Sequence, residues 1–156
     1  MRYHLVPDFS DADFEKMLNE FIERLIKVLE NELNQLGLEM LRDARLKTKA
    51  QGGYDDQTGN LRSSTFFRLI YEGQVVAEEF EESPRGTDRA TGLDEGRKYA
   101  EKITRENPEG WGIVLGAGME YASWVEAKGY DVITGATLGS EARLKKALDN
   151  VMRAFE

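Results

Sequence analysis

Apolar residues recur every three or four positions between residue 10 and about residue 50, which is the spacing of one face of an α-helix. Ser10 and Asp13 have the spacing of a capping box, and Asp11 adds negative charge to the first turn. At ~100° per residue, the apolar positions cover about half of the circumference. This arc is wider than a helix facing one sheet needs, so the sequence predicts a long first helix with apolar surface to spare.

Short segments rich in aromatic and β-branched residues predict strands at residues 65–71, 74–81, 111–116 and 130–134. Glu72-Gly73 reads as the turn of a hairpin between the first two. The strands are short and two of them are hairpin-linked, which argues against a doubly wound parallel sheet. We therefore expect an α+β fold, with a small, largely antiparallel sheet of about four strands packed by the long N-terminal helix and a C-terminal helix.

Further helix signals lie between and after the strands. Thr58 is the expected cap of a short helical turn that ends at residue 63. Thr91 and Asp94 have capping-box spacing and predict a helix to about residue 105. Residues 119–128 predict a short helix, and Ser140 is the expected cap of the last one. We expect residues 1–156 to form a single domain, with residues 1–9 as an N-terminal arm.

Composition narrows the possible functions. The 156 residues include no cysteine, which excludes a disulfide framework and a thiolate nucleophile. The chain carries 21 Lys and Arg against 29 Asp and Glu, a net charge of −8. It therefore lacks the basic footprint of sequence-independent DNA binding. We identify neither a signal-peptide core nor an apolar stretch long enough to span a bilayer, and expect no membrane association.

Chemistry-bearing patterns are weak. His4 is the only histidine, and it precedes all the predicted structure, so a catalytic base with a held position is not expected. The glycines between residues 110 and 118 lack the spacing and the following Lys-Ser/Thr of a phosphate-binding loop, and they favour close backbone packing instead. We expect no catalytic residue, metal or cofactor.

Three groups of residues are candidates for contacts with other molecules. Leu33 and Leu36 belong to a seven-residue apolar repeat on the first helix, which is typical of a helix–helix seam. Trp124 is a residue type that is common both in cores and at interface hot spots. Glu79 and Glu81 share one face of a strand, either as charge that protects a sheet edge or as the acidic lining of an assembled channel.

Two segments carry a family resemblance. The first is Asp56-Gln57-Thr58-Gly59-Asn60-Leu61-Arg62-Ser63-Ser64, just before the hairpin. The second runs through Trp111-Gly112-Ile113-Val114-Leu115-Gly116, Glu120-Tyr121-Ala122-Ser123-Trp124-Val125-Glu126 and Gly129-Tyr130-Asp131-Val132. With the long first helix and the closing helix, these segments resemble the small tail-completion or head–tail joining proteins of long-tailed phages. The resemblance covers residues 10–155, except for residues 83–108, which match nothing in the family pattern.

The resemblance implies a structural role at the neck of the virion, in rings that commonly contain six subunits. The implied partners are other copies of the chain, the connector or head-completion protein, and the tail-tube or terminator protein. DNA would pass without tight binding, and the chain would be made in the bacterial host cytoplasm. The positions that match the family motifs are Thr58, Gly59, Leu61, Arg62, Tyr121, Ala122 and Glu126.

The motif residues also suggest local roles. Thr58 would act as a cap, Gly59 would accommodate the backbone and Leu61 would be core. Arg62 and Glu126 have opposite charges and could form an ion pair, within one subunit or between two.

Other functions stay open at the level of sequence. Within the same class, the chain could be a tail terminator or a head-side adaptor. A small-ligand-binding or regulatory bacterial domain would require a pocket lined by Trp111, Tyr121 and Trp124. A hydrolase would require acidic residues that converge from several elements, and no sequence motif indicates this.

Overall fold

Helix α1 (Asp11–Leu46) begins at the predicted capping box. In the computed structural model, which describes residues 10–156, the backbone N–H of Asp13 donates to Ser10 Oγ at 3.2 Å. The Asp13 carboxylate in turn accepts from the backbone N–H of Ser10 at 3.0 Å. The helix ends about four residues earlier than predicted, and a short 3₁₀ helix, η1 (Lys49–Gln51), follows it.

The sheet has three strands instead of about four: β1 (Thr65–Tyr71), β2 (Gln74–Phe80) and β3 (Trp111–Ala117). β1 lies in the middle and pairs antiparallel with both neighbours, in the order β2-β1-β3. The hairpin turn is confirmed, because both Glu72 (φ 49°) and Gly73 (φ 70°) adopt the positive φ that a two-residue turn of this kind requires.

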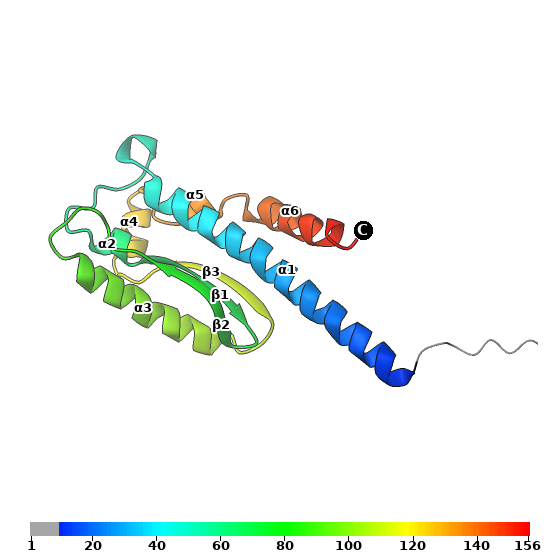
Figure 1. Ribbon diagram of the computed structural model, residues 1–156. Coiled ribbons are helices and arrows are strands. Elements are labelled where there is room, and N and C mark those ends of the chain that lie inside the picture. The colour runs from blue at the N-terminus through cyan, green and yellow to red at the C-terminus, as the bar shows by residue number, and fades with distance from the viewer. Residues whose placement is uncertain (1–9) are drawn as a thin grey trace, which may run out of the picture.

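The two faces of the sheet are covered by different helices (Figure 1). Phe67 and Leu69 of β1 pack with Leu33 and Leu41 of α1, and α6 (Ser140–Arg153) lies beside α1 on the same side. Side chains alternate along a strand, so Phe66, Arg68 and Ile70 point to the other face. That face is covered by α3 (Arg89–Glu106).

Residues 83–108, which match no part of the family pattern, are integral to the fold. Gly92, Gly96, Ala100 and Thr104 recur every four residues along α3 and are all buried. A Cβ on Gly92 would lie 2.1 Å from the carbonyl oxygen of Asn60, so only glycine permits this approach. Small residues thus let α3 lie directly on the backbone of the preceding segment.

The predicted fourth strand, residues 130–134, is wrong. One isolated parallel bridge joins Asp131 to Gly53, and the chain then enters a short helix, α5 (Thr134–Thr137). The Glu126 side chain, from α4, holds this turn by accepting from the backbone N–H groups of Ile133 and Thr134. The segment is rich in β-branched residues, but these hydrogen bonds favour a turn over a strand.

Three predicted caps also need correction. Helix α3 begins before Thr91, with Asp88 at its cap position, and the Thr91 hydroxyl donates to the Asp88 carboxylate at 2.6 Å. Ser140 is the first residue of α6, and Gly139 (φ 76°) precedes it as the cap. Gly59 (φ 79°), not Thr58, holds the cap position of α2 (Asn60–Ser63).

Candidate functional site

The turn that contains the first motif is organised by Asp56. Its carboxylate accepts from the backbone N–H of Gly59 at 3.0 Å and from that of Arg62 at 2.7 Å, so this side chain caps α2 from outside the helix. Thr58 contributes a weaker contact, since its Oγ1 accepts from the N–H of Asn60 at 3.3 Å. Gly59 is required twice over: its φ is positive, and a Cβ there would lie 2.4 Å from the carbonyl oxygen of Arg85.

Leu61 and Arg62 connect this turn to the protein interior. Leu61 is buried with Tyr54 and Val132 in a second hydrophobic cluster, as its predicted core role requires. The Arg62 guanidinium donates to the carbonyl oxygen of Arg45 at 2.6 Å and lies 5.5 Å from the centre of the Tyr54 ring. Burial raises the pKa of Tyr54 to about 12, so its hydroxyl is neutral at physiological pH.

The second motif supplies α4 (Ala122–Ala127) and its flanking residues. Ala122 packs against the cluster around Leu61. Glu126 Oε1 accepts from the N–H of Ile133 at 3.0 Å, and from both the N–H and the hydroxyl of Thr134 at 3.0 and 2.9 Å. Burial alone would raise the pKa of Glu126, but these hydrogen bonds outweigh it and lower that pKa.

The predicted ion pair between Arg62 and Glu126 is not formed within the chain. Arg62 bonds to a backbone carbonyl of α1, whereas Glu126 caps α5. Both side chains hold the fold together. The residue that sequence reasoning missed is Asp56, which stands at the start of the first motif and whose two acceptor oxygens could have suggested a capping role.

The two motifs meet around one cavity of about 320 Å³. Asp56, Thr58 and Leu61 line it from one side, and Tyr121 lines it from the other. Trp124 stands at the same cavity with 62% of its surface exposed, and the Lys128 Nζ lies 5.1 Å from its ring centre. Trp124 is therefore available for contact with another molecule, as an interface residue must be.

The three aromatic residues proposed for a ligand pocket do not share one. Tyr121 and Trp124 line the cavity between the motifs, whereas Trp111 lines a different one, between α1, β3 and α6. Tyr121 is partly exposed, and burial of part of its surface raises the pKa of its hydroxyl. The tri-aromatic ligand site expected for a regulatory domain is thus not assembled.

Leu33 and Leu36 are core residues instead of surface residues, with 4% and 5% of their surface exposed. They are covered within the chain because α1 packs on the sheet at this point. The surplus apolar surface lies nearer the N-terminus. Every residue from 11 to 24 is exposed, and the start of α1 extends beyond the rest of the fold (Figure 1). Towards the end of this segment, Phe21 packs against Phe155 and Arg24 donates to the carbonyl oxygen of Ala154. Its exposed large apolar side chains are Phe14, Met17, Leu18, Phe21 and Ile22.

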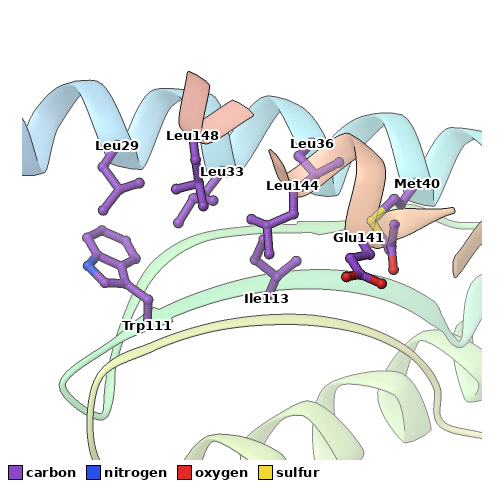
Figure 2. Close-up of a pocket in the computed structure, with 10 residues that line it drawn as sticks. Leu29, Leu33, Leu36, Met40, Trp111, Ile113, Glu141, Leu144 and Leu148 are labelled. Carbon is purple, nitrogen blue, oxygen red and sulfur yellow. The ribbon is translucent and has the colours of Figure 1, made fainter. Parts of the chain in front are cut away.

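A second apolar feature lies between α1, β3 and α6. It is a cavity of about 600 Å³, into which leucines of both helices point above Trp111 and Ile113 of the sheet (Figure 2). Leu144 and Leu148 of α6 are 36% and 44% exposed, so the cavity is a groove that opens to solvent. The residues that line it are Leu29, Leu33, Leu36, Met40, Trp111, Ile113, Ser140, Glu141, Leu144 and Leu148.

Glu79 and Glu81 have different surroundings. Glu79 is exposed opposite Phe67 in the β1–β2 pairing, on the α1 face of the sheet. Glu81 follows β2 and lies 3.5 Å from the guanidinium of Arg45, which is buried. Burial lowers the pKa of Arg45, and Glu81 acts against that change. Glu81 therefore neutralises a buried cation, and only Glu79 is left as a candidate for a channel lining.

Some predictions fall outside this geometry. His4 and the N-terminal arm lie outside the described residues. Within residues 10–156, no group of three Asp, Glu or His side chains is placed to hold a metal ion, and no helix is long and apolar enough to cross a membrane. Of the glycines between residues 110 and 118, Gly116 and Gly118 pack closely against Phe66 and Glu95, as predicted, whereas a Cβ on Gly110 would meet nothing within 4 Å.

Comparison with known proteins identifies no relative of this chain. No protein-family model, curated protein or solved structure matches the chain.

Proposed function

We propose that this protein is a structural subunit of the head–tail neck of a long-tailed phage or prophage, where it completes or joins the tail as part of a ring. The resemblance of its two motifs to tail-completion proteins is the reason for proposing this family. The neck position could equally be that of a tail terminator or a head-side adaptor. No catalytic residue or cofactor enters this proposal.

The observation that carries the proposal is the apolar surface of residues 11–24. Five large apolar side chains are exposed on this segment, and one of them, Phe21, also packs against Phe155. A surface of this kind is typical of protein–protein contacts. A subunit that works by assembly needs such a surface, whereas a monomeric enzyme or ligand-binding domain does not. The exposed Trp124 gives a second candidate contact on another part of the molecule.

The convergence of the two motifs gives independent support. The first motif ends at Ser64 and the second begins at Trp111, yet residues of both line the same cavity. The motif residues serve as caps and core contacts: Gly59 permits the turn, Leu61 fills the core and Glu126 caps α5. A motif with such roles preserves a shape for partners to recognise and needs no chemistry of its own.

The proposed partners are other copies of the chain, the connector or head-completion protein, and the tail-tube or terminator protein. The proposed location is the virion neck, after synthesis in the bacterial host cytoplasm. DNA would pass through the ring without tight binding, in keeping with a net charge of −8.

The test is the solution mass by light scattering over a concentration series, followed by negative-stain imaging of any large species. A closed ring, especially one of six subunits, is the expected result. A monomer at every concentration would shift the proposal to assembly on partners, and the chain should then bind tails isolated from its own phage or prophage. A chain that neither forms rings nor joins those tails contradicts the proposal.

A further inference from the structure

Strand β3 is an edge of the three-stranded sheet. The backbone N–H of Gly118 donates to the carbonyl oxygen of Ser64, and that of Glu72 donates to the carbonyl oxygen of Gly110. Bonding residues alternate along an antiparallel pair, so the even-numbered residues of β3 face β1. The odd-numbered residues therefore direct their N–H and C=O groups away from β1. Within residues 10–156, β3 pairs with no other strand.

The β3 edge also lacks the features that usually protect an edge strand. It contains no charged residue and no proline, whereas the opposite edge, β2, contains Glu78 and Glu79. Such residues discourage pairing with another chain. Every β3 residue except Gly116 is partly exposed. Of the two edges, β3 is therefore the one suited to accept a further strand.

Helix α6 lies over the position that a further strand would take. α1 packs on the central strand β1, and α6 packs beside α1 on the β3 side (Figure 2). The axes of packed helices are about 8–10 Å apart, and neighbouring strands are about 4.8 Å apart. The axis of α6 is therefore roughly two strand spacings from β1, which is one spacing beyond β3. Room for one strand explains why Leu144 and Leu148 stay partly exposed above a groove of about 600 Å³.

A strand at this position would be covered on one face only. α6 lies over that face, whereas α3 is centred on β1 on the opposite side of the sheet. The end of β3 is flanked by α4, so the room for a strand lies along residues 111–115. A strand with one buried face needs alternating apolar and polar side chains.

The chain contains a segment with this alternation next to its first helix. Tyr3 and Leu5 carry large apolar groups, whereas Arg2 and His4 between them are polar. Pro7 would end the pairing, because it has no N–H to donate. The spacing thus allows Tyr3 and Leu5 to enter the groove while Arg2 and His4 face solvent.

The charge of the groove is compatible with this occupant. Glu141 is the one charged residue among those that line it. Arg143 of α6 is paired with Asp43 at 2.8 Å and is not part of the lining. Residues 1–7 include Arg2 and no acidic side chain. The segment therefore brings no carboxylate against Glu141.

Residues 2–6 cannot pair along β3 of their own chain. The groove residue nearest to Ser10 along α1 is Leu29, about 28 Å away at a rise of about 1.5 Å per residue. Leu5 lies only five residues before Ser10, and five extended residues span about 18 Å at most. A segment that fills the groove must come from another copy.

We infer that residues 2–6 of one subunit add as a fourth strand to β3 of the next subunit, with Tyr3 and Leu5 in the groove under α6. This inference rests on the proposed assembly function and names a contact between copies. Main-chain hydrogen bonds to the odd-numbered residues of β3 hold the strand, and the groove selects its side chains. The contact is head-to-tail, since two different surfaces meet, as in a ring of identical subunits.

The first test compares the two faces of the added strand by light scattering. Leu5→Glu places a charge in the apolar groove and should weaken self-association roughly tenfold or more. His4→Glu, on the opposite face, is the matched control and should associate like the wild type. On the receiving side, Leu148→Glu should weaken association as Leu5→Glu does, whereas Leu138→Glu, which is exposed and outside the groove lining, should not.

Melting temperatures separate loss of this contact from loss of the fold. At a dilution where the wild type is itself monomeric, all four variants should melt at the wild-type temperature. A lower value for Leu148→Glu would leave Leu5→Glu and His4→Glu to decide. Equal association of Leu5→Glu and wild type overturns the inference, as does an equal loss in His4→Glu and Leu5→Glu.

Amide hydrogen exchange tests the backbone pairing itself. A synthetic peptide of residues 1–9 is added to the full-length Leu5→Glu variant, whose groove is intact. The amides of Ile113 and Leu115 point away from β1 and should exchange roughly tenfold more slowly with the peptide. Those of Gly112 and Val114 already bond to β1 and should change little. Unchanged exchange at Ile113 and Leu115 overturns the inference.

The assembly results separate this contact from the proposed function. A ring that forms equally well in Leu5→Glu supports the neck function and overturns this contact. A wild-type chain that stays monomeric but joins tails also leaves the neck function in place and overturns the contact. Association that depends on Leu5, in a chain that neither forms rings nor joins tails, supports the contact and contradicts the neck function.

Discussion

The ring of Phe67 lies directly against the backbone of Gly37. Phe67 is fully buried at the centre of the sheet, and a Cβ on Gly37 would lie 1.9 Å from its Cε2 atom. Glycine costs a helix interior about 1 kcal/mol relative to alanine, so its presence in the middle of α1 needs a reason. The reason is distance: the absence of a side chain lets the helix approach β1 closely enough to bury both apolar surfaces.

Gly37→Ala should therefore destabilise the protein even though alanine favours the helix. We expect a loss of about 1–3 kcal/mol in the free energy of unfolding, as for other overpacked cores. Urea denaturation measures it, with Asn31→Ala at an exposed position of α1 as the control. Adding Phe67→Leu to the Gly37→Ala variant should recover part of the loss. A Gly37→Ala protein more stable than wild type would show that the contact is not tight.

Arg68 is the central charged residue on the face of the sheet that α3 covers. It is 3% exposed, and its guanidinium lies 2.6 Å from Glu78, 3.0 Å from Glu101 and 2.9 Å from the Thr104 hydroxyl. These bonds link β1, β2 and α3. The two carboxylates keep substantial contact with water, whereas the cation does not.

This asymmetry predicts unequal effects of substitution. Arg68→Ala removes every link and leaves a void, and it should cost about 3 kcal/mol or more in unfolding free energy. Glu78→Gln leaves Glu101 to balance the cation, and it should cost about 1 kcal/mol or less. Urea denaturation of both variants gives the comparison. Equal costs would mean that Glu78 alone stabilises the buried cation.

Much of the fold could be predicted from local signals. The capping box at Ser10, the helical spacing after it and the Glu72-Gly73 turn each act over a few residues, and each is present in the structure. The apolar arc on the first helix correctly indicated surplus surface. Its location was wrong, because burial of Leu33 depends on where the sheet packs, and spacing alone does not show this.

The failures involve contacts between distant residues. Residues 130–134 have strand propensity, but Glu126 accepts hydrogen bonds from the backbone N–H groups of Ile133 and Thr134, and these bonds stabilise a turn. The pairing of Arg68 with Glu78 could not be predicted for a related reason. Counting back from the hairpin turn pairs Arg68 with Ala77, yet a bulge between Leu69 and Ile70 shifts the register and places Glu78 opposite.

Glu126 predicts a pH dependence of stability. Its pKa in the folded protein lies below the ordinary value of 4.5, because the α5 hydrogen bonds favour the carboxylate over the buried acid. A lowered folded pKa contributes stability above the unfolded pKa, and this contribution disappears as pH falls through the folded value. Glu126→Gln should therefore be less stable than wild type at pH 7, and the difference should shrink below about pH 4.5.

Chemical denaturation at pH 7 and at successive steps down to about pH 3 measures this difference. Glu120→Gln is the control, since Glu120 is an exposed carboxylate just before the same helix. A Glu126→Gln difference that stays constant over this range would show that the carboxylate charge does not contribute to the cap.

The same change of charge at Glu79 and at Glu81 should affect stability differently. Glu79→Lys alters an exposed side chain, so the fold and the assembly should persist while the ring retains DNA that the wild type releases. Glu81→Lys removes the counter-charge of Arg45, whose Nη1 atom has no hydrogen-bond acceptor within residues 10–156. The Glu81→Lys substitution should therefore lower the free energy of unfolding, which Glu79→Lys should not.

Filter binding of duplex DNA at about 50 and 150 mM salt measures retention, because screening weakens such contacts as salt rises. Glu109→Lys in the loop before β3 is the matched control for net charge. Greater retention by Glu79→Lys than by Glu109→Lys would place this face of β2 towards the DNA. Equal retention by the two variants would mean that net charge alone governs DNA binding, and the channel-lining role of Glu79 would then be wrong.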